Sequence, residues 1–194
     1  MQNIFERDNF LSLEQHSQLE SCLQHNWGAV ENESSWFASQ GLHSSLLPLD
    51  RLAPLVELLS RIRALHCEQF ACASSLAGLE WWINRNSSHG WHLDKDELLF
   101  KRSGVLRAAN RSYLYYLQRP ALGGELELMP DPLVPPTVQS KPTSLVQPVV
   151  GRLVAFDSKT YHRVKPYQGS RLSIAINAWS EPPSQFSCAH SLIL

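Results

Sequence analysis

The sequence lacks the features that mark membrane, secreted and nucleic-acid-binding proteins. No apolar run approaches the roughly 18 residues that a membrane-spanning helix needs. The formal net charge is only −1 over 194 residues, so no large basic field is available to hold nucleic acid. The opening residues, MQNIFERDNF, have neither the basic nor the apolar segment of a secretory signal. We therefore expect no membrane and no nucleic-acid partner.

Cysteine is scarce and shows no metal-binding or redox pattern. The four cysteines, Cys22, Cys67, Cys72 and Cys188, form no CxxC pair. This usage is typical of reduced thiols, and it predicts a cytoplasmic protein. The chain is 43% hydrophobic and 18% charged, which is enough apolar material for the core of one globular domain.

The first third of the chain has the apolar spacing of helices. Leucines recur over residues 11–27, where Ser12 and Gln15 are placed as a capping box. A stronger apolar stripe runs over residues 52–70, with a proline in its first turn. We expect a helical N-terminal layer over residues 1–74.

After residue 74, short runs rich in Trp, Tyr, Val and Ile alternate with turn residues, a pattern typical of strands. The expected strands are 79–84, 90–94, 111–117, 124–129, 149–157, 162–165 and 171–179. Strands and helices do not alternate, which argues against a doubly wound parallel sheet. We expect a mainly β jelly roll or sandwich over residues 75–180. Residues 181–194 form a C-terminal tail of the same single domain, 1–194.

The stretch WHLDKDE places His92 and Asp94 two residues apart. In an extended segment two such side chains point to the same face and can reach one metal ion. An imidazole with a carboxylate suits a divalent first-row metal, although a charged strand end without a metal is the alternative. His162 follows downstream. Arg171 then opens the apolar run RLSIAINAW, where a guanidinium needs an anionic partner. That partner is either Asp157 or Glu125, or a ligand carboxylate.

The ordered motifs HxD, GGEL, GRLVxF and a histidine followed by an arginine resemble the Fe(II)- and 2-oxoglutarate-dependent dioxygenases. The resemblance is strongest to their prolyl-4-hydroxylase-like branch and covers about residues 79–179. It implies a double-stranded β-helix (jelly roll) with the active site in its mouth. It implies Fe(II) as cofactor and 2-oxoglutarate and O2 as cosubstrates, and it leaves a role for ascorbate open.

The resemblance assigns roles to individual residues. His92, Asp94 and His162 match the family's 2-His-1-carboxylate triad, which leaves metal positions open for O2. Because Asp94 retains the carboxylate, the resemblance implies hydroxylation or a related oxidation rather than halogenation. Arg171 matches the basic residue that binds the distal carboxylate of 2-oxoglutarate. Tyr116 matches the tyrosine that supports the same carboxylate.

The neighbouring aromatic residues are less clearly placed. Tyr113 and Tyr115 point to the face opposite Tyr116 if the strand is regular, where they would pack in the core, and a one-residue slip would exchange the two sets. Trp82 stands where many relatives carry a tyrosine. An indole cannot supply a phenolic hydrogen bond, so Asn84 is a candidate substitute.

The implied reaction is hydroxylation of a peptidyl residue, a free amino acid or a small metabolite, with succinate and CO2 as co-products. The alternative is a non-oxidative jelly-roll protein, either a metal-binding module or a zinc hydrolase. Arg171 and Tyr116 discriminate between the two, because a zinc hydrolase does not need a clamp for a second carboxylate.

Several other segments have simpler interpretations. The proline-rich residues 133–148 are a candidate substrate lid. His89 is expected at the rim of the site, and residues 95–97 are expected either as a solvated strand end or as part of the substrate mouth. The pair Cys188 and His190 in the tail is not expected to form a second metal site.

Overall fold

A computed structural model of the chain describes residues 4–30, 34–38, 41–43, 49–70, 76–87, 89–129, 136–137, 140–141 and 144–187. Its helices are α1 (Leu13–His25), α2 (Trp27–Val30), α3 (Ala53–Gln69), α4 (Glu97–Ser103), α5 (Ser184–Ser187) and the 3-10 helix η1 (Leu49–Leu52). Its strands are β1 (Phe5–Arg7), β2 (Ser35–Ala38), β3 (Gly41–His43), β4 (Gly78–Arg85), β5 (Arg111–Gln118), β6 (Leu122–Gly123), β7 (Leu126–Leu128), β8 (Ser144–Val146), β9 (Leu153–Phe156), β10 (His162–Val164), β11 (Tyr167–Gln168) and β12 (Leu172–Trp179).

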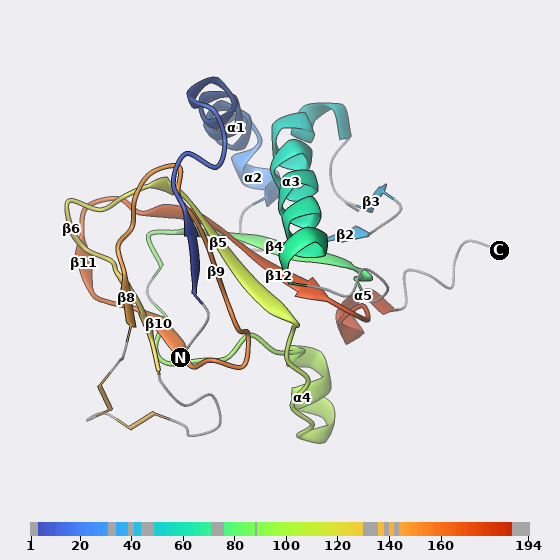
Figure 1. The fold of residues 1–194 in the computed structure, drawn as a ribbon. Coiled ribbons are helices and arrows are strands. Elements are labelled where there is room, and N and C mark those ends of the chain that lie inside the picture. Colours follow the sequence, from blue (N-terminus) through green and yellow to red (C-terminus); the bar gives the residue numbers. More distant parts are fainter. Residues whose placement is uncertain are drawn as a thin grey trace.

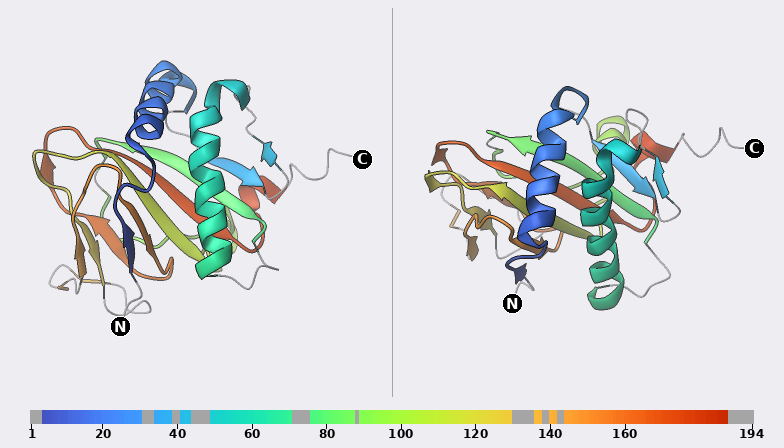
Figure 2. Two further views of the ribbon diagram at one scale, coloured as in Figure 1. Left: turned by 45° about the horizontal axis from the view of Figure 1, so that its top comes forward. Right: turned by 90° about the horizontal axis from the view of Figure 1, so that it is seen from above.

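A large antiparallel sheet forms the centre of the molecule. Its seven strands run in the order β1-β9-β5-β12-β4-β2-β3, and α1 and α3 lie together across one of its faces (Figures 1 and 2). A second sheet, β10-β7-β8, and the short pair β11-β6 complete the β structure. These two sheets form the expected jelly roll. Besides its helices, the N-terminal region contributes strands β1, β2 and β3 to the larger sheet.

The two long helices form for the reasons visible in the sequence. Ser12 caps α1: its hydroxyl accepts a hydrogen bond from the Gln15 backbone, while the Gln15 side chain accepts one from the Ser12 backbone. Along α3 the apolar stripe is fully buried, and it comprises Leu55, Leu58, Leu59, Ile62 and Leu65. Burial of this stripe against the sheet is the main stabilisation of the helical layer.

Alternation along the central strands divides the molecule into two faces. On β12, Leu172, Ile174 and Ile176 belong to the core beneath the helices. Ala175 belongs to a separate cluster on the opposite face, next to Ser173 and Asn177, which the strand period of two places on the same side. The first face is apolar and covered by helices. The second face opens toward the smaller sheet.

Two expectations about residues 90–97 are wrong. Residues 90–94 form no strand; His92 makes only an isolated bridge to His162. Asp96 is not part of a solvated strand end. It is buried, and its carboxylate accepts a hydrogen bond from the Leu99 backbone as the N-cap of α4. The residues DELLF therefore begin a helix. Asp96 is its N-cap, but it stands among other charged residues, and the sequence alone does not distinguish it from them.

None of the described helices has the length and apolarity needed to cross a membrane. Of the expected lid, 133–148, residues 136–137, 140–141 and 144–148 are described, and among them Ser144–Val146 form β8. Cys188 and His190 lie outside the described residues.

Candidate active site

Two histidines and an aspartate meet between the two sheets. His92 and His162 exchange backbone hydrogen bonds of 3.0 Å in both directions, which holds their ring centroids 4.2 Å apart. Asp94 Oδ1 lies 3.8 Å from His162 Nε2. One ligand atom from each of the three side chains lies within 4.8 Å of the other two. The three residues predicted from the sequence can therefore surround a single metal ion.

Backbone carbonyls fix the orientation of both imidazoles. His92 Nδ1 lies 2.7 Å from the Gly90 carbonyl oxygen, and His162 Nδ1 lies 3.0 Å from that of Thr160. A carbonyl only accepts, so each Nδ1 donates and each Nε2 keeps its lone pair for a metal. Burial, followed by the nearby His162, lowers the pKa of His92. Both effects favour the neutral imidazole that binds metals.

Asp94 is also held in place by a neighbour. Its Oδ2 accepts a hydrogen bond of 2.5 Å from Ser112 Oγ, on β5. The same hydroxyl lies 2.9 Å from Ser158 Oγ and 2.9 Å from Asn177 Oδ1. This buried cluster leaves Asp94 Oδ1 directed toward the histidines. Sequence analysis did not identify Ser112, because a serine in a strand carries no distinguishing pattern.

Arg171 is almost fully buried, with 1% of its surface exposed, yet it has no acidic partner among the described residues. Its Nη1 donates a hydrogen bond of 3.0 Å to Ser173 Oγ, whereas no described group accepts from Nε or Nη2. Glu125, one of the expected partners, lies 3.7 Å from Lys165 instead. A buried guanidinium without a counter-ion is costly, so this side chain is suited to an anionic ligand.

Tyr116 lies directly beside this arginine. The Arg171 guanidinium carbon is 5.4 Å from the centre of the Tyr116 ring. The Tyr116 hydroxyl is buried, and no described residue meets it in normal hydrogen-bond geometry. Burial raises the Tyr116 pKa, and the adjacent Arg171 guanidinium opposes that rise. Tyr113 and Tyr115 lie on the helix-covered face, as expected. Their hydroxyls are paired with buried His66 at 2.7 Å and with His16 at 2.8 Å.

A cavity of about 290 Å³ connects His92, Asp94 and His162 with Arg171. Its volume is close to the lower end of the range for small-molecule sites. Trp82 and Asn84 line it, and they pair with Ala175 and Ser173 across β4 and β12. Asn84 is therefore on the Arg171 side of the cavity. His89 also lines it from an exposed position, 5.6 Å between ring centroids from His92, which agrees with a rim residue.

Four further polar residues that the sequence does not single out line the cavity: Glu80, Asn177, Gln185 and Ser34. Alternation could have indicated the first two, since Glu80 lies two residues from Trp82 and Asn177 two from Ala175 on the same face. Gln185 comes from the C-terminal segment, and no local pattern predicts its return to the site.

The cavity, its His–Asp–His cluster and its buried arginine define the class of protein. Residues 81–179, slightly more than half of the chain, match the sequence profile of the 2OG-Fe(II) oxygenase superfamily. The chain belongs to this family. It is an Fe(II)- and 2-oxoglutarate-dependent dioxygenase, and the family accounts for both the metal and the cosubstrate that the cavity is suited to hold.

Solved structures with the same fold include prolyl hydroxylases. A prolyl-4-hydroxylase from Pseudomonas putida has a TM-score of 0.62 at 16% identity, covering 94% of this chain and 95% of that one. A prolyl hydroxylase from Trichoplax adhaerens, in complex with a hypoxia inducible factor peptide fragment, has a TM-score of 0.59 at 16% identity. The match covers 95% of this chain and 86% of that one. An oxygenase of the family from Burkholderia pseudomallei has a TM-score of 0.60 at 14% identity, and the match covers 93% of this chain and 86% of that one. No curated protein sequence matches the chain significantly.

Proposed function

We propose that this dioxygenase hydroxylates an amino-acid residue or a small metabolite, with His92, Asp94 and His162 holding Fe(II), and Arg171 and Tyr116 binding 2-oxoglutarate. The observation that carries the proposal is the pairing of a three-ligand cluster with unpartnered donors in one cavity. Arg171 Nε and Nη2 and the Tyr116 hydroxyl are all buried and unmatched. Buried polar groups normally have partners, and a ligand carboxylate would supply one for all three.

The three side chains of the triad would together hold the ion, and neighbouring groups would keep them in orientation. The ion, when bound, activates O2 in a reaction coupled to the decarboxylation of 2-oxoglutarate. Three protein ligands on one side of the ion leave its other positions free for cosubstrates. The carbonyls of Gly90 and Thr160 keep both Nε2 atoms aimed at the ion, and Ser112 keeps Asp94 in its orientation.

The other end of the cavity would position 2-oxoglutarate. The guanidinium of Arg171 presents two unmatched nitrogen atoms, which suits a two-point contact with a carboxylate. The Tyr116 hydroxyl would donate a third hydrogen bond to the same group. Leu114, Leu126 and Phe156 line the cavity and exclude water, which strengthens these charged contacts.

The substrate itself is supported only as a class. The Trichoplax adhaerens neighbour was solved with a peptide, which is consistent with a peptidyl substrate here. The cavity of about 290 Å³ equally admits a free amino acid or a small metabolite.

An anaerobic titration of the Fe(II)-loaded protein with 2-oxoglutarate tests the proposal. We expect a weak charge-transfer band in the visible, which should be absent in His162→Ala. His25→Ala is the matched control, because His25 is exposed on α1 and, among the described residues, is hydrogen-bonded only to Ser21 of the same helix. It should retain the band. Fe(II) binding without any band in the wild type would favour the metal-binding module or zinc hydrolase.

A further inference from the structure

The cavity continues past the metal triad to a second polar end. Asn177 pairs with Glu80 across β12 and β4, four residues along β12 from the pair of Ser173 with Asn84. At about 3.3 Å per residue the two pairs are roughly 13 Å apart. A five-carbon dicarboxylate anchored at Arg171 cannot reach this second end. Glu80, Asn177 and Gln185, which we call the acidic end, therefore remain available to another ligand.

Glu80 is a buried acid that has only neutral partners. Its side chain is 8% exposed; Oε2 accepts a hydrogen bond from Trp179 Nε1 at 3.0 Å, and Oε1 accepts one from Gln185 Nε2 at 2.8 Å. No described cation lies within ion-pair distance of it. The other buried acids that the structure describes outside the triad have such a partner, since Asp96 is bound by Arg107 and Glu127 by Arg163.

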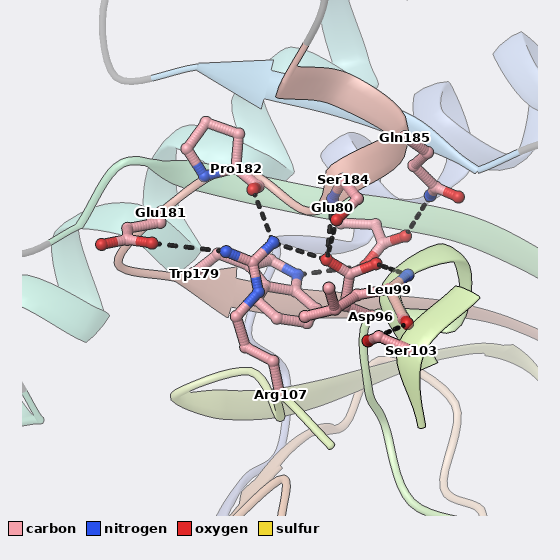
Figure 3. A network of polar contacts seen from close by, with 10 residues as sticks. All are labelled: Glu80, Asp96, Leu99, Ser103, Arg107, Trp179, Glu181, Pro182, Ser184 and Gln185. Carbon is pink, nitrogen blue, oxygen red and sulfur yellow. Dashed lines mark hydrogen bonds and ion pairs between the residues drawn. The ribbon is translucent and has the colours of Figure 1, made fainter. Parts of the chain in front are cut away.

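The wall that carries Gln185 is firmly attached to the site. Asp96 Oδ2 accepts hydrogen bonds from the Ser184 backbone at 2.8 Å and the Ser184 hydroxyl at 2.7 Å. Arg107 donates to the same carboxylate and, at 3.0 Å, to the Pro182 carbonyl. Figure 3 shows this network with Glu80 and Gln185 side by side next to it. The acidic end is therefore a built part of the cavity, braced by Asp96, which also lines the cavity, and by Arg107 and Ser184.

We propose that the acidic end binds a cationic nitrogen group of the substrate, an ammonium or a guanidinium, so that the enzyme oxidises a basic amino acid or residue. A cation supplies the charge that Glu80 lacks inside the protein. The amide oxygens of Asn177 and Gln185 can accept further N–H donors. The inference deepens the proposed function and rests on it, because the carbon to be oxidised must lie at the triad.

The spacing from the triad suits such a molecule. Ser112, which holds Asp94, pairs with Asn177, and Asn177 pairs with Glu80. Neighbouring strands are about 4.8 Å apart, so the backbones of Ser112 and Glu80 are roughly 10 Å apart. A cationic group at Glu80 would place the reacting carbon several bonds away, which fits the long side chains of lysine and arginine.

The protonation state of Glu80 provides a second, independent measure of cation binding. Burial raises the pKa of Glu80 to about 7, and hydrogen bonds from Trp179, Ser34 and Asn177 oppose this rise while the negative charge of Asp94 adds to it. A bound cation would stabilise the ionised carboxylate. Binding near neutral pH should then release a proton, and the calorimetric enthalpy should change with the ionisation enthalpy of the buffer.

The test is a calorimetric titration of the protein loaded with Mn(II) and 2-oxoglutarate. The probes are L-lysine and L-arginine, L-norleucine and L-citrulline, whose side chains are neutral, and peptides that contain an internal lysine, arginine, norleucine or citrulline and so carry no α-ammonium at the probed residue. We expect the cationic probes to bind about thirtyfold more tightly than the neutral ones, and Glu80→Gln to lose most of this preference. The matched control Glu181→Gln, whose side chain is 77% exposed, should keep it. Comparing free amino acids with peptides decides which source of the cation is used.

Two results would overturn the inference. One is equal binding of neutral and cationic probes to the wild-type protein, a comparison that needs no variant. The other is the absence of binding by every cationic probe, free or peptidyl. A parallel 2-oxoglutarate titration separates this failure from that of the proposed function and checks the fold of Glu80→Gln. If 2-oxoglutarate binds normally and the cations do not, only the inference fails; if 2-oxoglutarate does not bind the wild type, the proposed function itself fails.

Discussion

The two faces of the β5, β12 and β4 sheet differ in how their polar groups are satisfied. On the face covered by α1 and α3, the Tyr113 and Tyr115 hydroxyls pair with His66 and His16. On the cavity face, the adjacent Tyr116 hydroxyl and two nitrogen atoms of Arg171 have no partner among the described residues. Consecutive residues of one strand, such as Tyr115 and Tyr116 on β5, therefore lie on opposite faces.

This difference separates residues that stabilise the fold from residues that serve the ligand. On the helix-covered face both tyrosine hydroxyls are paired within the protein and the apolar groups contribute burial, although the Trp81 indole N–H has no partner among the described residues. The cavity face has unmatched donors and an uncompensated charge, which lower stability until a ligand binds. Substitutions on the first face should therefore change stability, and substitutions on the second should change binding.

The largest contrast is expected between Arg171 and Ile174, three residues apart on opposite faces. Arg171→Met should weaken 2-oxoglutarate binding by about 30-fold to several thousandfold, because a buried charge pair is lost. It should also leave the ligand-free protein as stable as wild type or about 1–4 kcal/mol more stable, since an unpaired buried charge is removed. Ile174→Ala should instead cost about 2–5 kcal/mol of unfolding free energy.

Calorimetric 2-oxoglutarate titrations and urea unfolding measure both quantities. Metal affinity should be the same in wild type and Arg171→Met, because Arg171 does not contact the triad. A large loss of stability in Arg171→Met would show that the guanidinium is satisfied within the protein, and the proposed separation of the two faces would then be wrong.

The pH dependence of the unfolding free energy should show how much the ionised, buried Glu80 carboxylate destabilises the folded protein. Its folded-state pKa is raised from 4.5 to about 7, so the proton is held more tightly in the folded protein than in the unfolded chain. The resulting stabilisation is complete below about pH 4.5 and is lost as the pH rises through about 7. The shift corresponds to roughly 3 kcal/mol.

Glu80→Gln should lack this contribution, so its stability relative to wild type should rise by up to that amount between pH 4.5 and 8. Urea unfolding at a series of pH values measures the difference. Glu181→Gln, at an exposed position, should show almost no such change. A difference between wild type and Glu80→Gln that stays constant with pH would mean that Glu80 titrates normally in the folded protein.

A smaller effect is expected at Ser112, which supports the metal site without joining it. Ser112→Ala removes the hydrogen bond to Asp94 Oδ2 and should weaken metal binding by about 10- to 100-fold. Ser158→Ala removes a neighbour of Ser112 that is not itself bonded to Asp94, and it should have a smaller effect. Competition between Mn(II) and a chelating dye measures both affinities. Equal affinities in Ser112→Ala and wild type would show that Asp94 is oriented by the backbone alone.

Much of the site could be predicted from the sequence because its residues occupy ordered motifs on regular elements. The triad, Arg171 and the face of Tyr116 all depend on short spacings and on strand alternation. The start of α4 at Glu97 is harder to predict, because Asp96 stands among other charged residues and its carboxylate is fixed in part by Arg107 and Ser184, which lie in other segments. Strand β1 has three residues, too few for a periodic pattern.

Contacts between distant segments could not be predicted in the same way. Gln185 reaches Glu80 only because the chain returns to the cavity after β12. The histidine partners of Tyr113 and Tyr115 lie in helices, and their positions depend on how α1 and α3 pack on the sheet. Such pairs require tertiary structure, whereas the alternation that separates Tyr115 from Tyr116 is already present in the sequence.

The smallest effects should come from this tyrosine pair, and they test the comparison most directly. Tyr115→Phe removes the hydrogen bond to His16 and should cost about 1 kcal/mol of stability while leaving 2-oxoglutarate affinity unchanged. Tyr116→Phe removes a hydroxyl without a protein partner, so stability should not fall, whereas 2-oxoglutarate affinity should drop by several-fold. Thermal unfolding and 2-oxoglutarate titration of both variants distinguish the two outcomes. If both variants lose stability equally and both bind 2-oxoglutarate normally, the Tyr116 hydroxyl belongs to the core, and Arg171 alone binds the distal carboxylate.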